Sequence, residues 1–396
     1  MIFTTPNKNI SSILGTGPDE IDTPKQGSDR VLLICVIFLM VFGILAVYSA
    51  IAYFAKTNHT TAFSMVIGHI IKLVIAFSVM LIASKVDYHI VKRFSHAALI
   101  LSWLMLIGLL IFGNEMFGAR RSLEIGGYSF QPSSFAAISL LIHVSVLLSE
   151  KQEYIKDLKR AFIPIMFWVL PTCGLIAIED FSSAAVLLGM CMLLMFIGRI
   201  SLLQLGGMVV IGALGAVLLV SLSPERQSRV DQYVSQIEHI QAKKFNVKEG
   251  YQAQQADIAI ARGKIFGVGM GESTQRDFLP ASYNDFIFAI IAEEYGLLGS
   301  IFLLAIFVVI LFRGIAIIAK NAPDTLGTLL AVAATVTITT YGFVNAAVAS
   351  GLLPVTGLPM PFISYGGSSM LFSGLMVGFL LNISKHSTKK RSVFYA

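Results

Sequence analysis

The chain has 396 residues, of which 56% are hydrophobic and 13% are charged, with a net charge of +6. Soluble domains carry about 25% charged residues. The composition therefore excludes a soluble globular protein and indicates a polytopic membrane protein, whose apolar surface a bilayer can cover.

The first 30 residues are polar and lack the charged start, apolar core and cleavage site of a removable signal peptide. They predict a flexible tail before a retained membrane anchor. Ten apolar runs follow, each long enough, or nearly so, to cross about 30 Å of hydrocarbon at 1.5 Å per residue. Their approximate bounds are 31–53, 64–84, 96–113, 131–149, 161–178, 181–198, 202–222, 286–312, 324–350 and 362–384.

The distribution of Lys and Arg predicts the orientation of these spans. With both termini in the cytoplasm, 17 of the 29 basic residues lie in cytoplasmic segments and only three in short external loops. The sequence therefore predicts an all-α membrane protein with a cytoplasmic tail (1–30), a ten-helix membrane domain (31–385) and a basic cytoplasmic tail (386–396). A large external loop, about 223–285, separates helices seven and eight. The basic excess follows this topology and needs no nucleic acid to explain it.

Carboxylates mark the entry of the chain into the eighth span. Asp285 stands at the head of the apolar run, and Glu293 and Glu294 lie inside it. A carboxylate at the centre of a membrane helix costs about 2.5–3.5 kcal/mol, so such residues usually face a wet cavity or a partner. Asp285 is a candidate catalytic residue, although the same position suits a helix N-terminal charge stabilised by the macrodipole.

Two further external segments carry unusual charges. Arg120 and Arg121 follow the third span and offer planar paired donors that suit a pyrophosphate, or they anchor the chain to lipid headgroups. Glu179 and Asp180 form the turn between the fifth and sixth spans, which either is solvated or faces a cavity.

The long external loop contains a segment, 251–262, whose spacing predicts an interfacial amphipathic helix. The glycines at 267, 269 and 271 follow no strand and lack the residues of a phosphate-binding loop, so flexible backbone is predicted there. Three prolines preclude a regular helix through 354–361. Lys72, with His69, lies within the second span, where a lysine needs a partner.

No His/Cys cluster has zinc spacing, and no nucleophile elbow occurs. A carboxylate at the interface, nearby guanidinium groups and an outward-opening groove suit a lipid-linked pyrophosphate substrate. The carboxylate would take a proton from a sugar hydroxyl, and cations would neutralise the leaving pyrophosphate. Transport of such a substrate fits the same features.

Four ordered motifs carry a family resemblance: "GARRSLEIGGYSFQPSS", "EDFSSAA", "GMGESTQRDFLPASYNDFIFAIIAEEYG" and "PVTGLPMPFISYGGSS". With them the chain resembles the SEDS family (shape, elongation, division and sporulation), and its division branch more than its elongation branch. The resemblance implies a bacterial inner-membrane glycosyltransferase that polymerises lipid II into peptidoglycan glycan strands. It also implies a class B penicillin-binding protein transpeptidase as partner, with other division or elongation membrane proteins. A divalent cation, Mg or Mn, is the candidate cofactor.

The resemblance assigns roles to residues of these motifs. Asp285 matches the essential aspartate that activates the 4-hydroxyl group of the acceptor sugar. The implied substrate-binding residues are Arg120, Arg121, Gln131, Asp180, Gln275 and Ser364. The candidate supporting residues are Lys72, Glu179 and Glu294.

The chain departs from the family pattern at several of these motifs. Ser122 replaces a tryptophan, Ser134 a glutamate, and Ala137 the lysine that pairs with the essential aspartate. Lys72 is one candidate replacement for that missing cation. A lipid-linked precursor transporter and a catalytically impaired division scaffold stay open as alternatives.

Overall fold

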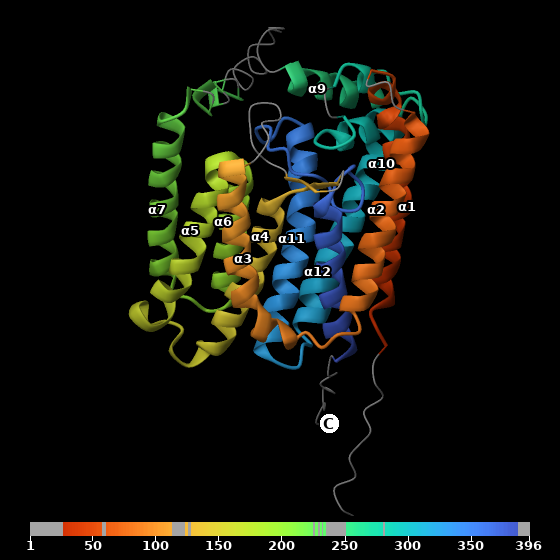
Figure 1. Ribbon diagram of the computed structural model, residues 1–396. Coiled ribbons are helices and arrows are strands. Elements are labelled where there is room, and N and C mark those ends of the chain that lie inside the picture. Colours follow the sequence, from red (N-terminus) through yellow and green to blue (C-terminus); the bar gives the residue numbers. More distant parts are fainter. Residues whose placement is uncertain are drawn as a thin grey trace, which may run out of the picture.

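The computed structural model describes residues 27–57, 61–112, 123–125, 128–224, 226–228, 230–231, 233–234, 251–279 and 282–386. Within these residues the helices run up and down in one bundle, and α9 lies across one end (Figure 1). The long helices are α1 (Arg30–Thr57), α2 (Ala62–Ala83), α3 (Ile90–Phe112), α4 (Pro132–Glu150), α5 (Ile163–Glu179), α6 (Phe181–Ile197), α7 (Leu202–Ser221), α10 (Ile287–Phe312), α11 (Thr325–Ala349) and α12 (Ser368–Lys385). The shorter elements are β1 (Leu123–Ile125), β2 (Tyr128–Phe130), η1 (Gln152–Tyr154), η2 (Leu158–Phe162), α9 (Tyr251–Gly263), η3 (Gln275–Asp277) and η4 (Arg313–Ala319).

The helix pattern confirms a polytopic all-α membrane protein. Nine helices of the described chain are long and apolar enough to cross a membrane, and α6 is a tenth apolar helix. α1 begins and α12 ends at one end of the bundle, and α9 lies at the other (Figure 1). We call the α9 end the outer end, following the orientation that Lys and Arg predict. The amphipathic helix predicted at 251–262 is α9.

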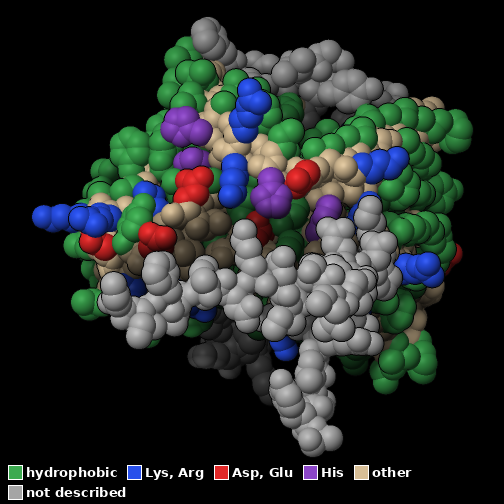
Figure 2. All heavy atoms as spheres, turned by 90° about the horizontal axis from the view of Figure 1, so that it is seen from below, with side chains coloured by type: hydrophobic (Ala, Val, Ile, Leu, Met, Phe, Trp, Pro, Cys, Tyr) green, Lys and Arg blue, Asp and Glu red, His purple; other side chains and the backbone are tan. Residues whose placement is uncertain are grey.

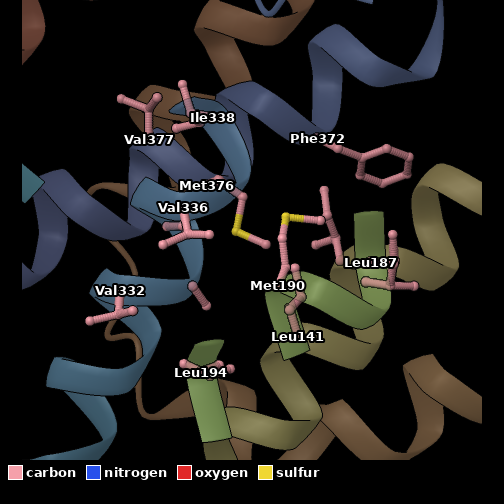
Figure 3. Close-up of a cluster of buried hydrophobic side chains, with 14 of the residues drawn as sticks. Leu141, Leu187, Met190, Leu194, Val332, Val336, Ile338, Phe372, Met376 and Val377 are labelled. Atoms are coloured by element: carbon pink, nitrogen blue, oxygen red, sulfur yellow. The ribbon is translucent and has the colours of Figure 1, made fainter. Parts of the chain in front are cut away.

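The core of the bundle is formed by α4, α11 and α12. In their most apolar windows 67%, 72% and 78% of the residues are buried, against 11% for the peripheral α7. Figure 3 shows Met190 of α6 and Met376 of α12 pointing toward one another, beside side chains of α11 such as Val336. Because lipid tails are as apolar as these side chains, close packing rather than water exclusion holds membrane helices together.

Two helix starts differ from the prediction. α3 begins at residue 90 rather than 96, because exposed polar residues extend its first turn beyond the apolar run. α12 begins at residue 368 rather than 362, because the backbone of 362–367 contacts the segment before α10. A short antiparallel hairpin of three residue pairs, formed by β1 and β2, was not predicted; it pairs Leu123 with Phe130.

The eighth span is broken, whereas the sequence predicts an unbroken helix over 286–312. Gly296 adopts φ 66° and ψ −164°, far from helical values. The break frees the carbonyl groups of Glu293 and Glu294, which accept hydrogen bonds from the N–H groups of Val268 and Gly269 at 3.0 and 3.1 Å.

The N–H groups that follow the break also find their hydrogen-bond acceptors in the same loop. The N–H groups of Leu297 and Leu298 donate to the carbonyl oxygens of Lys264 and Ile265 at 2.9 and 3.2 Å. Backbone polar groups at membrane depth must be satisfied within the protein. The loop 264–269, predicted as flexible backbone, is thus a hydrogen-bonded partner that lets the span change direction.

Charged side chains gather in the middle of the end opposite α9 (Figure 2). There the His89 ring contacts Asp87 through Nδ1 at 2.7 Å and Asp324 through Nε2 at 2.8 Å. The Tyr88 hydroxyl donates to Asp324 at 2.9 Å, and the Tyr88 N–H donates to Asn382 at 3.2 Å. This cluster joins the α2–α3 turn to the start of α11 and the end of α12.

The cluster predicts a pH-dependent contribution to stability. Burial lowers the pKa of His89, but hydrogen bonds and charges of Asp87 and Asp324 outweigh it, so the net pKa is raised. The pKa of Asp324 is lowered overall, because hydrogen bonds from its neighbours outweigh burial. The histidine contribution is complete below a pH of about 6.5 and is lost as pH rises through its folded pKa; the Asp324 contribution is lost as pH falls below about 3.9.

We therefore expect His89→Gln to destabilise the protein most between about pH 4 and pH 6.5. Because the ring is 45% exposed, the effect should stay within about 1 kcal/mol. Thermal unfolding in detergent across this pH range and at higher pH measures it, with the exposed Lys92→Gln as control. A difference from wild type that is constant with pH would contradict the prediction.

Candidate active site

Asp285 lies in a turn, residues 282–286, that ends where α10 begins. Asn345 of α11 donates from its side-chain nitrogen to the carbonyl oxygens of Asp285 at 3.1 Å and Leu358 at 2.9 Å. Asn345 is buried, so these bonds are shielded from water. They fix the backbone of Asp285 to α11 and to the connection between α11 and α12.

Ser364 fixes the same turn from the other side. Its hydroxyl group donates to the carbonyl oxygen of Asn284 at 2.7 Å and accepts from the N–H of Met360 at 2.8 Å. The next residue, Tyr365, donates its N–H to the carbonyl oxygen of Tyr283 at 2.8 Å. Ser364 was predicted to bind substrate; it is 1% exposed, and here its hydroxyl serves to hold the Asp285 turn.

We expect Asn345→Leu to lower the free energy of unfolding by about 1–3 kcal/mol, because the buried carbonyl groups of Asp285 and Leu358 lose their donor. The matched control is Asn321→Leu, since the Asn321 side chain bonds only one turn back, to Ile317. Thermal unfolding in detergent compares the two variants. Equal losses of stability would contradict a special role for Asn345.

The two buried carboxylates of α10, Glu293 and Glu294, have hydrogen-bond partners within the protein. Glu293 is fully buried and accepts hydrogen bonds from the N–H groups of Thr274 and Gln275, both at 3.2 Å. Arg262 of α9 lies 3.5 Å from the same carboxylate. The external loop is thereby attached to α10. Gln275, a predicted substrate-binding residue, is itself buried in this contact.

Glu294 points to a different neighbour. It is 2% exposed and accepts a hydrogen bond from the hydroxyl group of Ser49 on α1. Arg276 contacts the same serine at 3.2 Å. Glu294 thus links α1 to α10 within the protein, and its predicted supporting role in the site stays a prediction.

Asp180 begins α6. Its carboxylate accepts hydrogen bonds from the N–H of Ser183 at 3.2 Å and from the Ser183 hydroxyl at 2.7 Å, which is the geometry of a helix N-cap. Asp180 and Glu179 line a small cavity of about 10 Å³. The pair predicted to form either a solvated turn or a cavity wall thus belongs to a cavity wall.

Gln131 lies at the start of α4, where its N–H donates to Ser368 at 3.0 Å and its side-chain oxygen accepts from Ser134 at 3.1 Å. Both Gln131 and Ser134 line a second cavity of about 10 Å³, which is room for about one water. Ala137, which stands where the resemblance expects a lysine, lines it as well.

These features adjoin one another. The two cavities share Ser133 and Ile176 in their walls. The second cavity is also lined by Leu358, whose carbonyl group shares the Asn345 donor with Asp285. The structure thus connects the predicted residues Asp180, Gln131 and Asp285 through adjoining elements at the outer half of the bundle.

Tyr283 neighbours the candidate catalytic residue. Burial, the Asp285 charge and Tyr365 raise the pKa of Tyr283 to about 12. The phenol therefore stays protonated at neutral pH, and its ring forms an apolar wall beside the Asp285 turn.

Lys72 approaches this wall from α2. Its ammonium nitrogen lies 3.9 Å from the ring centre of Tyr365, and the Tyr365 ring stands edge-on to Tyr283 at 5.7 Å. In the part of the chain that the structure describes, no ion pair joins Lys72 to Asp285. The proposed replacement of the missing cation by Lys72 stays a prediction.

Arg120, Arg121 and Ser122 lie outside the described residues, so the predicted pyrophosphate contacts stay predictions. The described residues include no group of three or more His, Cys, Asp or Glu side chains arranged to hold a metal ion. The Mg or Mn cofactor likewise stays a prediction.

A larger apolar cavity of about 520 Å³ lies between α9, α10 and α11. Phe288, Leu304 and Phe343 line it, with Lys264 near its α9 side. It offers no carboxylate, so its chemistry differs from that of the site around Asp285.

Sequence reasoning missed Asn345 and Tyr283. A single asparagine within the apolar run of α11 was a usable signal, because an amide at membrane depth needs hydrogen-bond partners. Tyr283 gave no such signal, since an aromatic residue at a membrane interface is common.

Known proteins are similar in sequence to this chain over most of its length. A family model for FtsW, RodA and SpoVE, described as cell cycle protein, matches residues 29–389. Stage V sporulation protein E of Bacillus subtilis is 33% identical over 92% of this chain and 99% of its own length. A probable peptidoglycan glycosyltransferase FtsW of Coxiella burnetii is 32% identical over 90% and 96%.

Solved structures share the fold. A chain of a peptidoglycan synthase complex that coordinates polymerization and crosslinking has a TM-score of 0.72 at 22% identity, covering 90% of this chain and 98% of that one. The rod shape determining protein RodA of Thermus thermophilus has a TM-score of 0.64 at 21% identity, covering 91% and 96%.

Proposed function

Because the chain belongs to the FtsW, RodA and SpoVE family of cell cycle proteins, we propose that it is a peptidoglycan glycosyltransferase that polymerises lipid II. The observation that carries the proposal is the Asp285 turn, held by Asn345 and Ser364 at the outer half of a membrane bundle. Relatives of similar length are named as probable glycosyltransferases of this kind. A position in the bacterial inner membrane, at the division septum, fits these relatives.

In the proposed reaction Asp285 acts as general base. Its carboxylate accepts the proton of the acceptor sugar 4-hydroxyl group as that oxygen bonds to the anomeric carbon of the donor. The bond between this carbon and the pyrophosphate breaks, and the lipid pyrophosphate leaves with the electron pair. Cationic side chains stabilise the charge that develops on it, and Arg120 and Arg121 are our candidates.

We also propose that the chain works with a class B penicillin-binding protein transpeptidase. A related chain has been solved within a peptidoglycan synthase complex that joins polymerization to crosslinking. Other division or elongation membrane proteins are further candidate partners.

The test uses the full-length protein, alone and with its co-expressed transpeptidase partner. Labelled lipid II is supplied in detergent, and glycan polymer is resolved by gel. We expect polymer with the wild-type protein. Lipid II that crosses liposome membranes without polymer would favour a transporter instead, and partner binding with neither activity would favour a scaffold.

A further inference from the structure

α2 carries a positive charge well inside its apolar length. Lys72 lies ten residues beyond Ala62, the first residue of the helix, or about 15 Å along the axis. A charge at such depth is costly and normally has a partner. No described carboxylate lies within ion-pairing distance of Lys72, and its contact is the Tyr365 ring at 3.9 Å.

His69, one turn before Lys72, also lacks a hydrogen-bond partner. Its side chain is fully buried, and neither ring nitrogen has a hydrogen-bond partner. The ring stacks on Tyr365, with centroids 5.8 Å apart. Buried polar groups nearly always have partners. His69 and Lys72, which both contact the Tyr365 ring, are therefore an unusual pair of neighbouring side chains without polar partners.

The direction of Lys72 indicates where an occupant would enter. Side chains of a helix lean toward its N-terminus, and α2 begins at the outer end of the bundle (Figure 1). The ammonium group is therefore directed outward, onto Tyr365, which bonds through its N–H to Tyr283 beside Asp285.

The surroundings of Lys72 restrict the kind of anion that can reach it. The adjacent surface of α2 is apolar and exposed, with Ile71, Val74 and Ile75 each at least 42% accessible. A hydrophilic anion would have to give up its water shell to reach this depth, which is unfavourable. An anion attached to a hydrocarbon chain would place that chain along the same apolar surface.

We propose that Lys72 binds a phosphate group of the lipid-linked substrate, with His69 as a second donor and Tyr365 holding the ammonium group in place. This proposal rests on the proposed function and adds a specific contact to it. It differs from a role of Lys72 as counter-ion of Asp285, because the ammonium group contacts the Tyr365 ring and no ion pair joins Lys72 to Asp285 in the described residues.

The test measures binding without turnover. Full-length protein in nanodiscs is titrated with a polyprenyl pyrophosphate, with the matching polyprenol and with phosphatidylglycerol. We expect the wild-type protein to bind the pyrophosphate at least tenfold more tightly than either other lipid. Lys72→Met should reduce this preference below threefold, and Lys72→Arg should largely restore it. The control is Lys85→Met, two residues beyond the last residue of α2, which should leave the preference unchanged.

Two results would overturn the proposal. One is a tenfold preference that survives in Lys72→Met; the other is equal wild-type affinity for phosphatidylglycerol, which would indicate a general headgroup site. In turnover assays Lys72→Met should raise the KM for lipid II about tenfold and leave kcat within threefold. Absence of polymer from the wild-type protein would refute the proposed function, while the binding assay would still decide the role of Lys72.

Discussion

Replacement of Asp285 by asparagine should lower the rate of glycan polymerisation by about 10²–10⁴-fold, the usual contribution of a general base. Asparagine has nearly the same shape but cannot accept the proton of the acceptor hydroxyl. The contacts that fix the turn involve the backbone of Asp285 and of its neighbours, so they persist in the variant. The loss should therefore appear in kcat, with little change in thermal stability.

The matched control is Asp277→Asn, eight residues earlier in the same external segment. Asp277 is 46% exposed and lies 3.7 Å from the neighbouring Arg276, so its removal should change the polymerisation rate by less than about twofold. An Asp285→Asn variant that keeps more than one tenth of wild-type activity would refute the role of Asp285 as base.

The helices were predictable from sequence for a physical reason. Backbone groups in hydrocarbon must bond within their own segment, so each span leaves a long apolar run in the sequence. The connections were less predictable, because they depend on partners distant in the chain. The start of α12 moved because Ser364 and Tyr365 bond to residues 283–284, and no local pattern reveals that contact.

The candidate site, too, was predictable where motifs mark it and unpredictable where it depends on distant partners. Asp285, Gln131 and Asp180 were predicted from their motifs, and the structure brings their elements together. The role of Glu294 was not predictable, because its partner Ser49 lies 245 residues away. The internal hydrogen bonds of Ser364 were not predictable for a related reason: a hydroxyl group in a motif looks the same whether it meets a ligand or a carbonyl group of its own chain. The substrate-binding role of Ser364 stays a prediction.

Substitution of Gly296 by alanine should destabilise the protein severely, by more than about 3 kcal/mol. The conformation at Gly296, with φ 66° and ψ −164°, is one that other residues occupy at a cost of about 1–3 kcal/mol. A Cβ atom would also lie 2.4 Å from the nitrogen of Gly267 and 2.5 Å from the carbonyl oxygen of Ile265. Relief of that overlap would separate the loop 264–269 from the break and leave its backbone partners unsatisfied.

The comparison that isolates this effect is Gly215→Ala on α7, where a Cβ would meet no atom within 4 Å. That change should be neutral or stabilising by up to about 1 kcal/mol, because alanine favours the helix. Thermal unfolding and the yield of monodisperse protein in detergent measure both variants. If Gly296→Ala matched Gly215→Ala in stability, the bend of α10 would not depend on the glycine, and α10 could be continuous in solution. The attachment of the external loop to the span that follows Asp285 would then rest on side-chain contacts such as those of Glu293 with Thr274, Gln275 and Arg262.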